Sequence, residues 1–228
     1  MTALQRHARV WPTASGYATL AREARVATTR LAVDLWFRRE CPLVVRRTED
    51  DEPRCGEEIA VGLALPPSLG KQRLKFRLKR SDIAMHAPPL LLDTVVALSN
   101  PSLQRTLTPL ARTAARAHVA RRVFGSWAWQ AQTGLDYVQN DSDIDLLAEP
   151  STRGELNSAI ALLEGAQGDV ALRLDGEIVF PGGDAVAWRE WASQENHGNR
   201  VLVKSVQCVG FMVRSDLLDR LDRQRLAA

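Results

Sequence analysis

The chain has 228 residues, a formal net charge of +3 at pH 7 and 45% hydrophobic residues. This length suffices for one large domain or two modest ones with substantial cores, and the composition is ordinary for a globular protein. No apolar run approaches the roughly 20 residues of a membrane span, and the N-terminus lacks the apolar segment of a secretory signal. Three widely spaced cysteines (Cys41, Cys55 and Cys208) form no metal or redox motif. We therefore expect unpaired thiols and a cytoplasmic protein.

The first third of the chain predicts a small α+β unit. Residues 27–40 have helical spacing, with Leu31, Leu35 and Trp36 on the inner side. Three later segments predict strands: 42–47, 59–65 and 71–80. The acidic loop 49–52 between the first two is expected to be mobile, and the proline-containing segment 84–89 reads as a linker. We accordingly predict an N-terminal α+β domain over residues 1–88 and a second domain over 89–228.

Basic residues alternate with apolar ones along the third predicted strand. Its charged face carries Lys71, Arg73, Lys75, Arg77 and Lys79. Such a face could bind nucleic acid, a polyphosphate or an acidic protein. The alternative is an edge strand that uses lysine to keep other strand edges away. The pattern alone leaves both open.

The rest of the chain predicts helices and strands around a central motif. The helices are expected over 90–98, over 102–119 with Pro109 kinking or splitting it, over 153–164, around Trp188 and Trp191 with Asp184 as cap, and over 216–226. Strands are expected over 170–174 and 177–180, joined by a hairpin turn at Asp175-Gly176, and over 201–213. Lys204 interrupts the last strand, either as a snorkelling lysine or as a phosphate ligand.

The central motif spans residues 121–147. A strand ends at Gly125-Ser126, and a short helix and a loop lead to a second strand with Asp143 and Asp145. Residues two apart in a strand point the same way, so both carboxylates share one face. Two such acids can hold hard divalent cations, which commonly also take phosphate oxygens. The Gly-Ser turn at a helix start offers N–H groups and a hydroxyl to a phosphate. Together they predict phosphoryl or nucleotidyl transfer.

A second charged feature lies just before this motif. Residues 101–126 contain several arginines and no acidic residue. A positive patch beside a carboxylate cluster suits an anionic substrate held by a metal. The other interpretation is a solvated helix face. The sequence does not separate the two.

This order of elements resembles the nucleotidyltransferase superfamily that includes DNA polymerase β. The matching residues are Gly125-Ser126 and Asp143-Ile144-Asp145. The resemblance implies an α+β fold in which residues 89–228 form a mixed sheet flanked by helices. It also implies a third carboxylate on a later strand. Asp175 is the best placed candidate and Glu177 the next, although both flank the predicted turn.

The chain further resembles the phosphoribosyl-dephospho-CoA transferases, the holo-acyl-carrier-protein synthases of malonate decarboxylase. The resemblance covers nearly the whole chain in the expected order. Its segments are 42–47, 62–67, Gly125-Ser126 with Trp129-Gln130 and Thr133-Gly134, 142–147, Asp175-Gly176-Glu177 and Trp188-Arg189-Glu190.

The resemblance implies an activity and a set of site residues. The family transfers 2'-(5''-triphosphoribosyl)-3'-dephospho-CoA to a serine of the acyl-carrier subunit of malonate decarboxylase, forming a phosphodiester and releasing pyrophosphate. The expected catalytic residues are Asp143, Asp145 and Asp175, with two Mg²⁺ ions held by Asp143 and Asp145. The expected donor-binding residues are Gly125, Ser126 and Lys204.

Two other functions are compatible with the residues. One is a nucleotidyltransferase with a different acceptor, such as a protein AMP-transferase or an antitoxin-like enzyme. The other is a non-catalytic nucleic-acid-binding protein built on the basic strand. Charge does not separate them, because a positive protein suits both nucleic acid and an acidic carrier protein.

Overall fold

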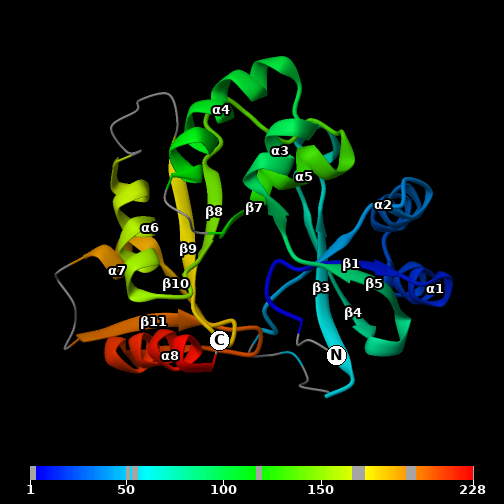
Figure 1. The fold of residues 1–228 in the computed structure, drawn as a ribbon. Helices are drawn as coiled ribbons and strands as arrows, with labels where there is room; N and C mark the ends of the chain where they lie inside the picture. Colours follow the sequence, from blue (N-terminus) through cyan, green and yellow to red (C-terminus); the bar gives the residue numbers. More distant parts are fainter. Residues whose placement is uncertain are drawn as a thin grey trace. The chain divides into compact units, whose positions relative to one another are not determined.

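The computed structural model describes residues 4–49, 52, 56–116, 120–165, 173–193 and 199–227 (Figure 1). The chain forms two compact units. Unit 1 comprises Met1–Pro89, Gln132–Tyr137 and Val206–Cys208, and unit 2 comprises Leu90–Ala131, Val138–Ser205 and Val209–Ala228. Both combine helices with a sheet, which confirms the predicted α+β class. In the described ranges, each helix is too short or too polar to cross a bilayer.

Unit 1 is built on a five-stranded antiparallel sheet of order β4-β3-β2-β1-β5. Its strands are β1 (Arg9–Pro12), β2 (Leu43–Val45), β3 (Glu58–Ala64), β4 (Arg73–Lys79) and β5 (Ile83–Ala87). Its helices are α1 (Ala14–Glu23) and α2 (Ala27–Arg38), with short 3-10 turns η1 (Pro67–Leu69) and η2 (Arg80–Asp82). Two returning segments join it through backbone oxygens: the Tyr137 hydroxyl donates to Ala64 O (2.7 Å) and the Thr48 N–H to Val206 O (2.9 Å).

Two predictions for this unit were wrong in detail. Leu31 is 68% exposed, because α2 turns Ala32 and Val33 inward beside Trp36, whose predicted burial is confirmed. Residues 83–87 form no linker but strand β5, which pairs with β1. At the ends of the acidic loop, Glu49 and Glu52 form ion pairs with Lys75 and Arg46, and the mobility of the loop stays a prediction. Residues 50–51 of that loop lie outside the described residues.

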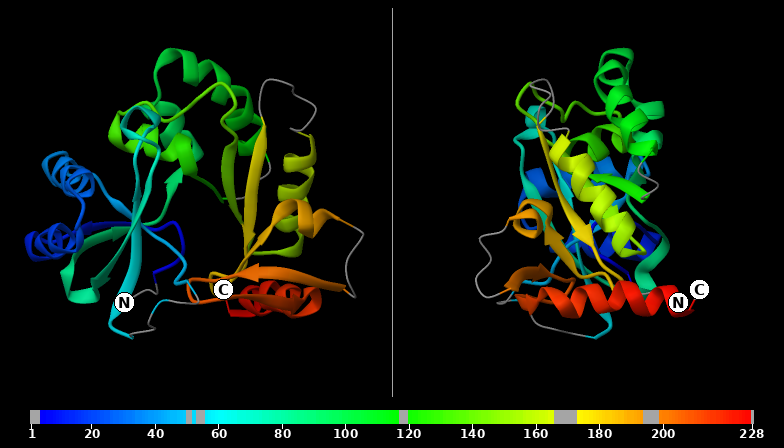
Figure 2. Two further views of the ribbon diagram at one scale, coloured as in Figure 1. Left: turned by 180° about the vertical axis from the view of Figure 1, so that it is seen from behind. Right: turned by 60° about the vertical axis from the view of Figure 1, so that its left-hand side comes forward.

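Unit 2 is built on a seven-stranded mixed sheet of order β12-β11-β10-β9-β8-β7-β6 (Figure 2). The strands are β6 (Leu90–Leu91), β7 (Ala120–Phe124), β8 (Ile144–Glu149), β9 (Leu174–Val179), β10 (Ala185–Ala187), β11 (Arg200–Lys204) and β12 (Val209–Val213). The helices are α3 (Leu92–Leu98), α4 (Pro101–Ala115), α5 (Gly125–Thr133), α6 (Arg153–Gly165), α7 (Trp188–Ala192) and α8 (Arg214–Ala227). Strands β8 and β9 are parallel, as expected when helix α6 connects them.

The two faces of this sheet differ in chemistry. One face is apolar and packs with residues of α3, α4, α6, α7 and α8 into a single core. Its strand residues include Val123, Ile144, Leu146, Leu174, Ile178, Val186, Val201 and Val203. Strand residues alternate between faces, so the residues between these point to the other side. That second face carries the carboxylates predicted from the sequence.

The structure corrects the predicted hairpin in this unit. Strand β9 runs without a turn through Asp175-Gly176, and residues 170–172 of the predicted partner strand lie outside the described residues. Gly176 is needed for close packing: a Cβ there would lie 2.1 Å from the carbonyl oxygen of Leu146. Asp175 and Glu177 are therefore mid-strand residues.

Two further predictions were wrong. The predicted strand over 201–213 is the antiparallel hairpin β11–β12. Asp184 does not cap α7, since β10 separates the two and Arg220 Nη1 donates to Asp184 Oδ2 (2.6 Å). Helix α4 continues through Pro109, so the proline does not split it, and the alternative of a kink stays a prediction. The buried side of this helix carries Leu107, Leu110 and Ala114.

Candidate active site

Two carboxylates lie side by side on the polar face of the unit 2 sheet. Asp145 on β8 and Asp175 on β9 are register partners in the parallel pair, and Leu147 pairs in the same way with Glu177. Neighbouring strands are about 4.8 Å apart, and in-register residues point to the same side. Glu177 follows Asp175 by two residues, so it shares this face. The pairing of strands far apart in sequence thus brings these acids together. With Asp143, which stands just before β8, they form a row of acids: Asp143, Asp145, Asp175 and Glu177.

The turn from β7 into α5 presses against the first of these acids. Gly125 begins α5 with a positive φ of 67°. A Cβ on Gly125 would lie 2.0 Å from Asp145 Oδ2. The missing side chain thus leaves room for the carboxylate beside the start of a helix, where a negative charge is favourable. The sequence predicted Gly125 as a phosphate cradle; the structure shows that its immediate neighbour is Asp145.

Two acids of the row, Asp143 and Asp175, form ion pairs with arginines. Arg173 Nε lies 2.8 Å from Asp143 Oδ1, and Asp143 stands just before β8. Arg189, at the start of α7, donates from Nη1 to Asp175 Oδ1 (2.8 Å) and from Nη2 to Leu174 O (2.7 Å). Both arginines have exposed side chains. Two of the three predicted catalytic acids therefore carry a guanidinium partner.

Glu177 and Lys204 form the most buried charge pair of this row. Lys204 Nζ lies 3.1 Å from Glu177 Oε1, and the Glu177 side chain is only 8% exposed. Lys204 reaches this face because it pairs with Ala185, which in turn pairs with Val179 on the Glu177 side of β9. The Lys204 ammonium compensates the charge of a buried carboxylate, whereas a snorkelling lysine would only extend its ammonium into water. Binding of a phosphate by Lys204 stays a prediction.

The oxygen-only chemistry of the row fits a hard divalent cation. Asp145 and Asp175 are adjacent, and carboxylates are the ligands that Mg²⁺ prefers. Within the ranges the structure describes, however, no three potential ligands converge on one point. Asp143 is turned toward Arg173. Ser126 follows Gly125 in the first turn of α5, and its role as a phosphate ligand stays a prediction.

The sequence reasoning missed Arg173 and Arg189 as part of this site. Which arginine meets which acid depends on the register of β8 with β9 and of β9 with β10, which no local pattern shows. A weak signal existed for Arg189, since it belongs to the Trp188-Arg189-Glu190 segment that resembles the family. Glu190 has a separate task there, because its Oε1 accepts from the Leu202 N–H at 2.6 Å.

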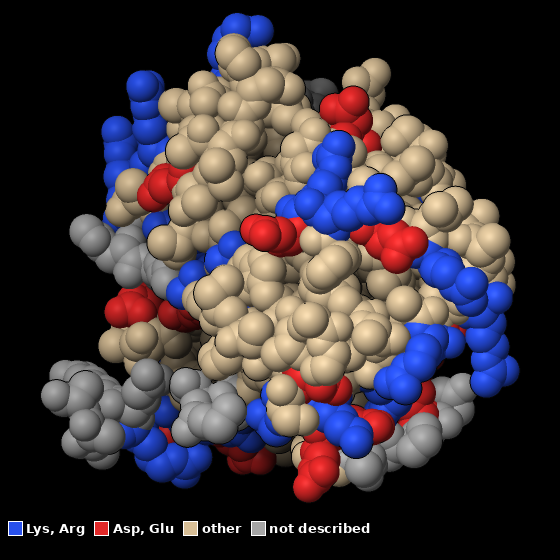
Figure 3. All heavy atoms as spheres, turned by 90° about the vertical axis from the view of Figure 1, so that its right-hand side faces the viewer, with Lys and Arg blue, Asp and Glu red and all other residues tan. Residues whose placement is uncertain are grey.

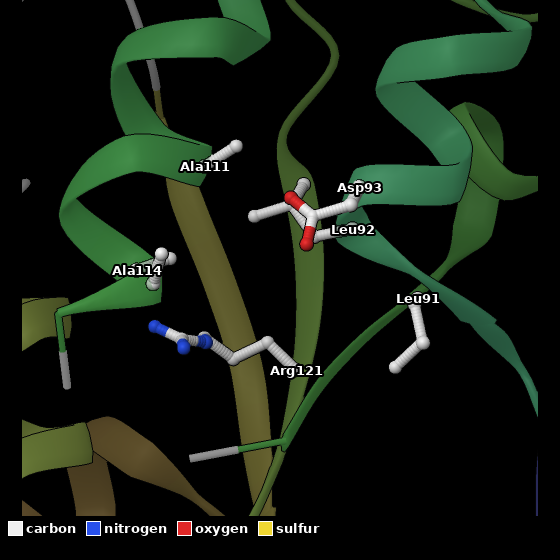
Figure 4. A pocket seen from close by; sticks show the side chains of 7 residues that line it. Leu91, Leu92, Asp93, Ala111, Ala114 and Arg121 are labelled. Carbon is white, nitrogen blue, oxygen red and sulfur yellow. The ribbon is translucent and has the colours of Figure 1, made fainter. Parts of the chain in front are cut away.

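Two of the arginines before the motif lie on different faces of the sheet. Arg121 and Arg122 are adjacent in β7 and therefore point to opposite faces of the sheet. Arg122 Nε donates to Glu149 Oε2 (2.9 Å) on the polar face. Arg121 points to the other face of the sheet, where it lines a small cavity of about 140 Å³ together with Asp93 (Figure 4). Burial lowers the pKa of Arg121. This cavity is separate from the carboxylate row.

The basic strand is the edge strand β4 of unit 1. Two of its cations are paired, Lys75 with Glu49 (2.6 Å) and Arg77 with Glu58 (2.9 Å). Arg73 and Lys79 are exposed and form no ion pair within the part of the chain that the structure describes. On the face shown in Figure 3, acidic side chains are interspersed with basic ones. Because two of its cations are paired with acids, β4 presents less positive charge than its sequence alone predicts.

Comparisons with known proteins cover almost the whole chain. Residues 5–89 match the family described as "Phosphoribosyl-dephospho-CoA transferase MdcG N-terminal domain", and residues 90–215 match its C-terminal domain. A phosphoribosyl-dephospho-CoA transferase of Xanthomonas euvesicatoria pv. vesicatoria is 40% identical, covering 80% of this chain and 83% of its own length.

Two further relatives carry the same name. The protein of Xanthomonas campestris pv. campestris (strain 8004) is 37% identical over 87% of this chain and 89% of its own. That of Bradyrhizobium diazoefficiens is 34% identical over 93% of this chain and 92% of its own. No solved structure matches the chain significantly. With both family domains present in order, the chain belongs to the phosphoribosyl-dephospho-CoA transferase family.

Proposed function

We propose that this protein transfers 2'-(5''-triphosphoribosyl)-3'-dephospho-CoA to a serine of the acyl-carrier subunit of malonate decarboxylase. The name shared by relatives at 34–40% identity supports a donor derived from dephospho-CoA. The carrier subunit as acceptor follows from the family resemblance. The reaction forms a phosphodiester and releases pyrophosphate.

One observation carries the catalytic part of this proposal. Asp145 and Asp175 are register partners, and Asp145 lies against Gly125 at the start of α5. A carboxylate pair beside a helix N-terminus places cation ligands next to N–H groups that favour a phosphate. A protein that only binds nucleic acid has no need of such an arrangement.

The residues of the row divide the work of the transfer. Asp145 and Asp175 would hold Mg²⁺, with Asp143 joining them when Arg173 moves away. Bound there, Mg²⁺ would neutralise charge on the attacking and leaving oxygens. Gly125 and Ser126 orient the triphosphate at the start of α5. Lys204 adds a positive charge while it compensates Glu177.

The bonds balance as follows. The serine Oγ of the carrier forms a bond to the α-phosphorus of the donor, and the bond from that phosphorus to the bridging oxygen breaks. The electron pair of the broken bond leaves with pyrophosphate. We assign the serine proton to the carboxylate of Asp175, the most exposed of the three acids. Holding both reactants in line lowers the barrier further.

The test combines the protein, Mg²⁺, the triphosphoribosyl donor and the apo carrier subunit. Intact-mass spectrometry of the carrier should show the added phosphoribosyl-dephospho-CoA group, and a coupled assay should show equimolar pyrophosphate. Replacing the modified serine of the carrier by alanine serves as the control. An unmodified carrier at complete Mg²⁺ and donor saturation would contradict the proposal.

A further inference from the structure

We propose that Arg173 and Arg189 form the binding site for the triphosphate of the donor and for the pyrophosphate product. In the protein without ligands they neutralise Asp143 and Asp175, and on binding they exchange these carboxylates for phosphate oxygens. The proposal rests on the function proposed above and assigns two residues to it that the family resemblance gives no role.

The two arginines are placed on either side of the acid row. Arg173 stands just before β9, two residues before Asp175, and forms an ion pair with Asp143. Arg189 lies in α7, directly after β10, whose last residue Ala187 pairs with Glu177. From there it forms an ion pair with Asp175. Both guanidiniums therefore lie on the face that carries Asp145. A triphosphate bound at this face would lie within the reach of both.

Their present contacts are of a kind that opens easily. The Arg173 and Asp143 side chains are 71% and 35% exposed, and those of Arg189 and Asp175 are 51% and 53% exposed. Exposed ion pairs contribute little to stability because water screens them. A divalent cation held by Asp145 and Asp175 would compete with Arg189 for Asp175 Oδ1, and one that also took Asp143 as a ligand would compete with Arg173. The displaced arginines then face a ligand with several negative charges.

Guanidiniums suit that ligand. The planar fork of arginine donates two parallel hydrogen bonds to a phosphate, and it is always charged. Arg189 is also kept close to the site after it leaves Asp175, because its guanidinium stacks 4.7 Å from the Trp188 ring centroid and donates to Leu174 O. The site thus holds positive charge ready for the phosphates without leaving the acids uncompensated beforehand.

The exchange predicts effects of opposite sign on two ligands. In Arg173→Ala and Arg189→Ala a competing cation is removed, so titration calorimetry should show Mn²⁺ or Mg²⁺ affinity rising about two- to fivefold. Pyrophosphate affinity at saturating Mg²⁺ should fall about tenfold or more in each variant. Arg189→Lys, which keeps the charge but loses the fork, should recover only part of the pyrophosphate affinity.

Arg153→Ala is the matched control. Arg153 forms an equivalent exposed pair with Asp222 (2.6 Å, side chains 50% and 51% exposed) between α6 and α8. These helices pack on the other face of the sheet. Neither the cation affinity nor the pyrophosphate affinity should change in this variant.

The outcomes separate this proposal from the function proposed above. Unchanged pyrophosphate affinity in both alanine variants would overturn the exchange, whatever the transfer activity. A fall in cation affinity would also overturn it, since it would show that the arginines support the cation site rather than compete for it. A wild-type protein that binds Mg²⁺ and pyrophosphate with the expected variant effects, yet leaves the carrier unmodified, would support the exchange and contradict the assigned acceptor.

Discussion

Gly125 and Asp145 lie so close together that the glycine hydrogen alone separates the backbone from the carboxylate. A Cβ at Gly125 would stand 2.0 Å from Asp145 Oδ2, and the Gly125 φ is +67°. In Gly125→Ala, the new methyl group must therefore displace the Asp145 carboxylate, and the left-handed backbone at this position is strained as well. We expect transfer activity to fall at least about a hundredfold, the scale lost with one main electrostatic contributor. Steady-state assays and calorimetric Mg²⁺ titration would measure it.

Gly134 provides the control for backbone strain. It has the same φ of +67°, but a Cβ there would meet no atom within 4 Å. Gly134→Ala should lose about 1 kcal/mol of stability for its left-handed backbone and keep near-normal activity. Equal activity losses in the two variants would refute the specific role of the Gly125–Asp145 contact.

Neutralising the acid row should abolish activity without unfolding the protein. Asp143→Asn, Asp145→Asn and Asp175→Asn keep the side-chain size but remove the charge that a cation needs. Turnover should fall by at least about two orders of magnitude in each. Melting temperatures should barely change, because the ion pairs of Asp143 and Asp175 are solvent-exposed and contribute little to stability. Asp222→Asn, which removes a comparable arginine partner, should leave turnover unchanged.

The Glu177–Lys204 pair should respond unequally to loss of its two partners. Lys204→Met removes the ammonium from a carboxylate whose side chain is 8% exposed, and should cost about 3 kcal/mol of stability. Glu177→Gln should cost about 1 kcal/mol, because the Lys204 side chain is 36% exposed and can reach water. Urea denaturation would measure both. A larger cost for Glu177→Gln would show that Lys204 is the more buried charge.

Charge reversal on β4 tests the choice of macromolecular partner. Arg73 and Lys79 are its exposed cations outside the observed ion pairs. In Arg73→Glu/Lys79→Glu, the KM for the carrier protein should rise with a weaker dependence on salt, while the KM for the donor should stay the same. The equal charge change in Arg22→Glu/Arg25→Glu on or near α1 should leave both KM values unchanged.

The nucleic-acid alternative predicts a different result for the same β4 variant. Binding of DNA or RNA would then weaken, and the log–log salt slope would fall by roughly two. Tight nucleic-acid binding by the wild type at physiological salt, without carrier modification, would favour that alternative over the transferase.

Glu52 should make stability depend on acidity. The hydrogen bonds from Arg46 lower the pKa of Glu52 from 4.5 to about 2 in the folded protein. A lowered folded pKa gives stability that is fully present above pH 4.5 and lost as the pH falls toward 2. Glu52→Gln should therefore lose about 1.5–3 kcal/mol at neutral pH, with the difference from wild type shrinking in acid. Glu49→Gln, at an exposed pair, should show a much smaller loss.

Local patterns were sufficient for the central motif. The end of β7, the glycine that starts α5 and the alternation around Asp145 all depend on neighbours in sequence, and the structure places them as predicted. The hairpin predicted at Asp175-Gly176 was wrong, although Asp-Gly is a strong hairpin signal. Its glycine serves instead a close approach to Leu146 on a distant strand. Partners such as Arg189 depend on strand register, which periodicity does not specify.

The way unit 1 collects its segments affects how relatives of this protein can be recombined. Its strands come from the first part of the chain, but Gln132–Tyr137 and Val206–Cys208 return to it from the later part. Tyr137 and Val206 then bond to Ala64 and Thr48. A chimera joined only after residue 89 would pair one parent's sheet with the other parent's returning segments. A compatible exchange in this chain must therefore carry three separate pieces of sequence together.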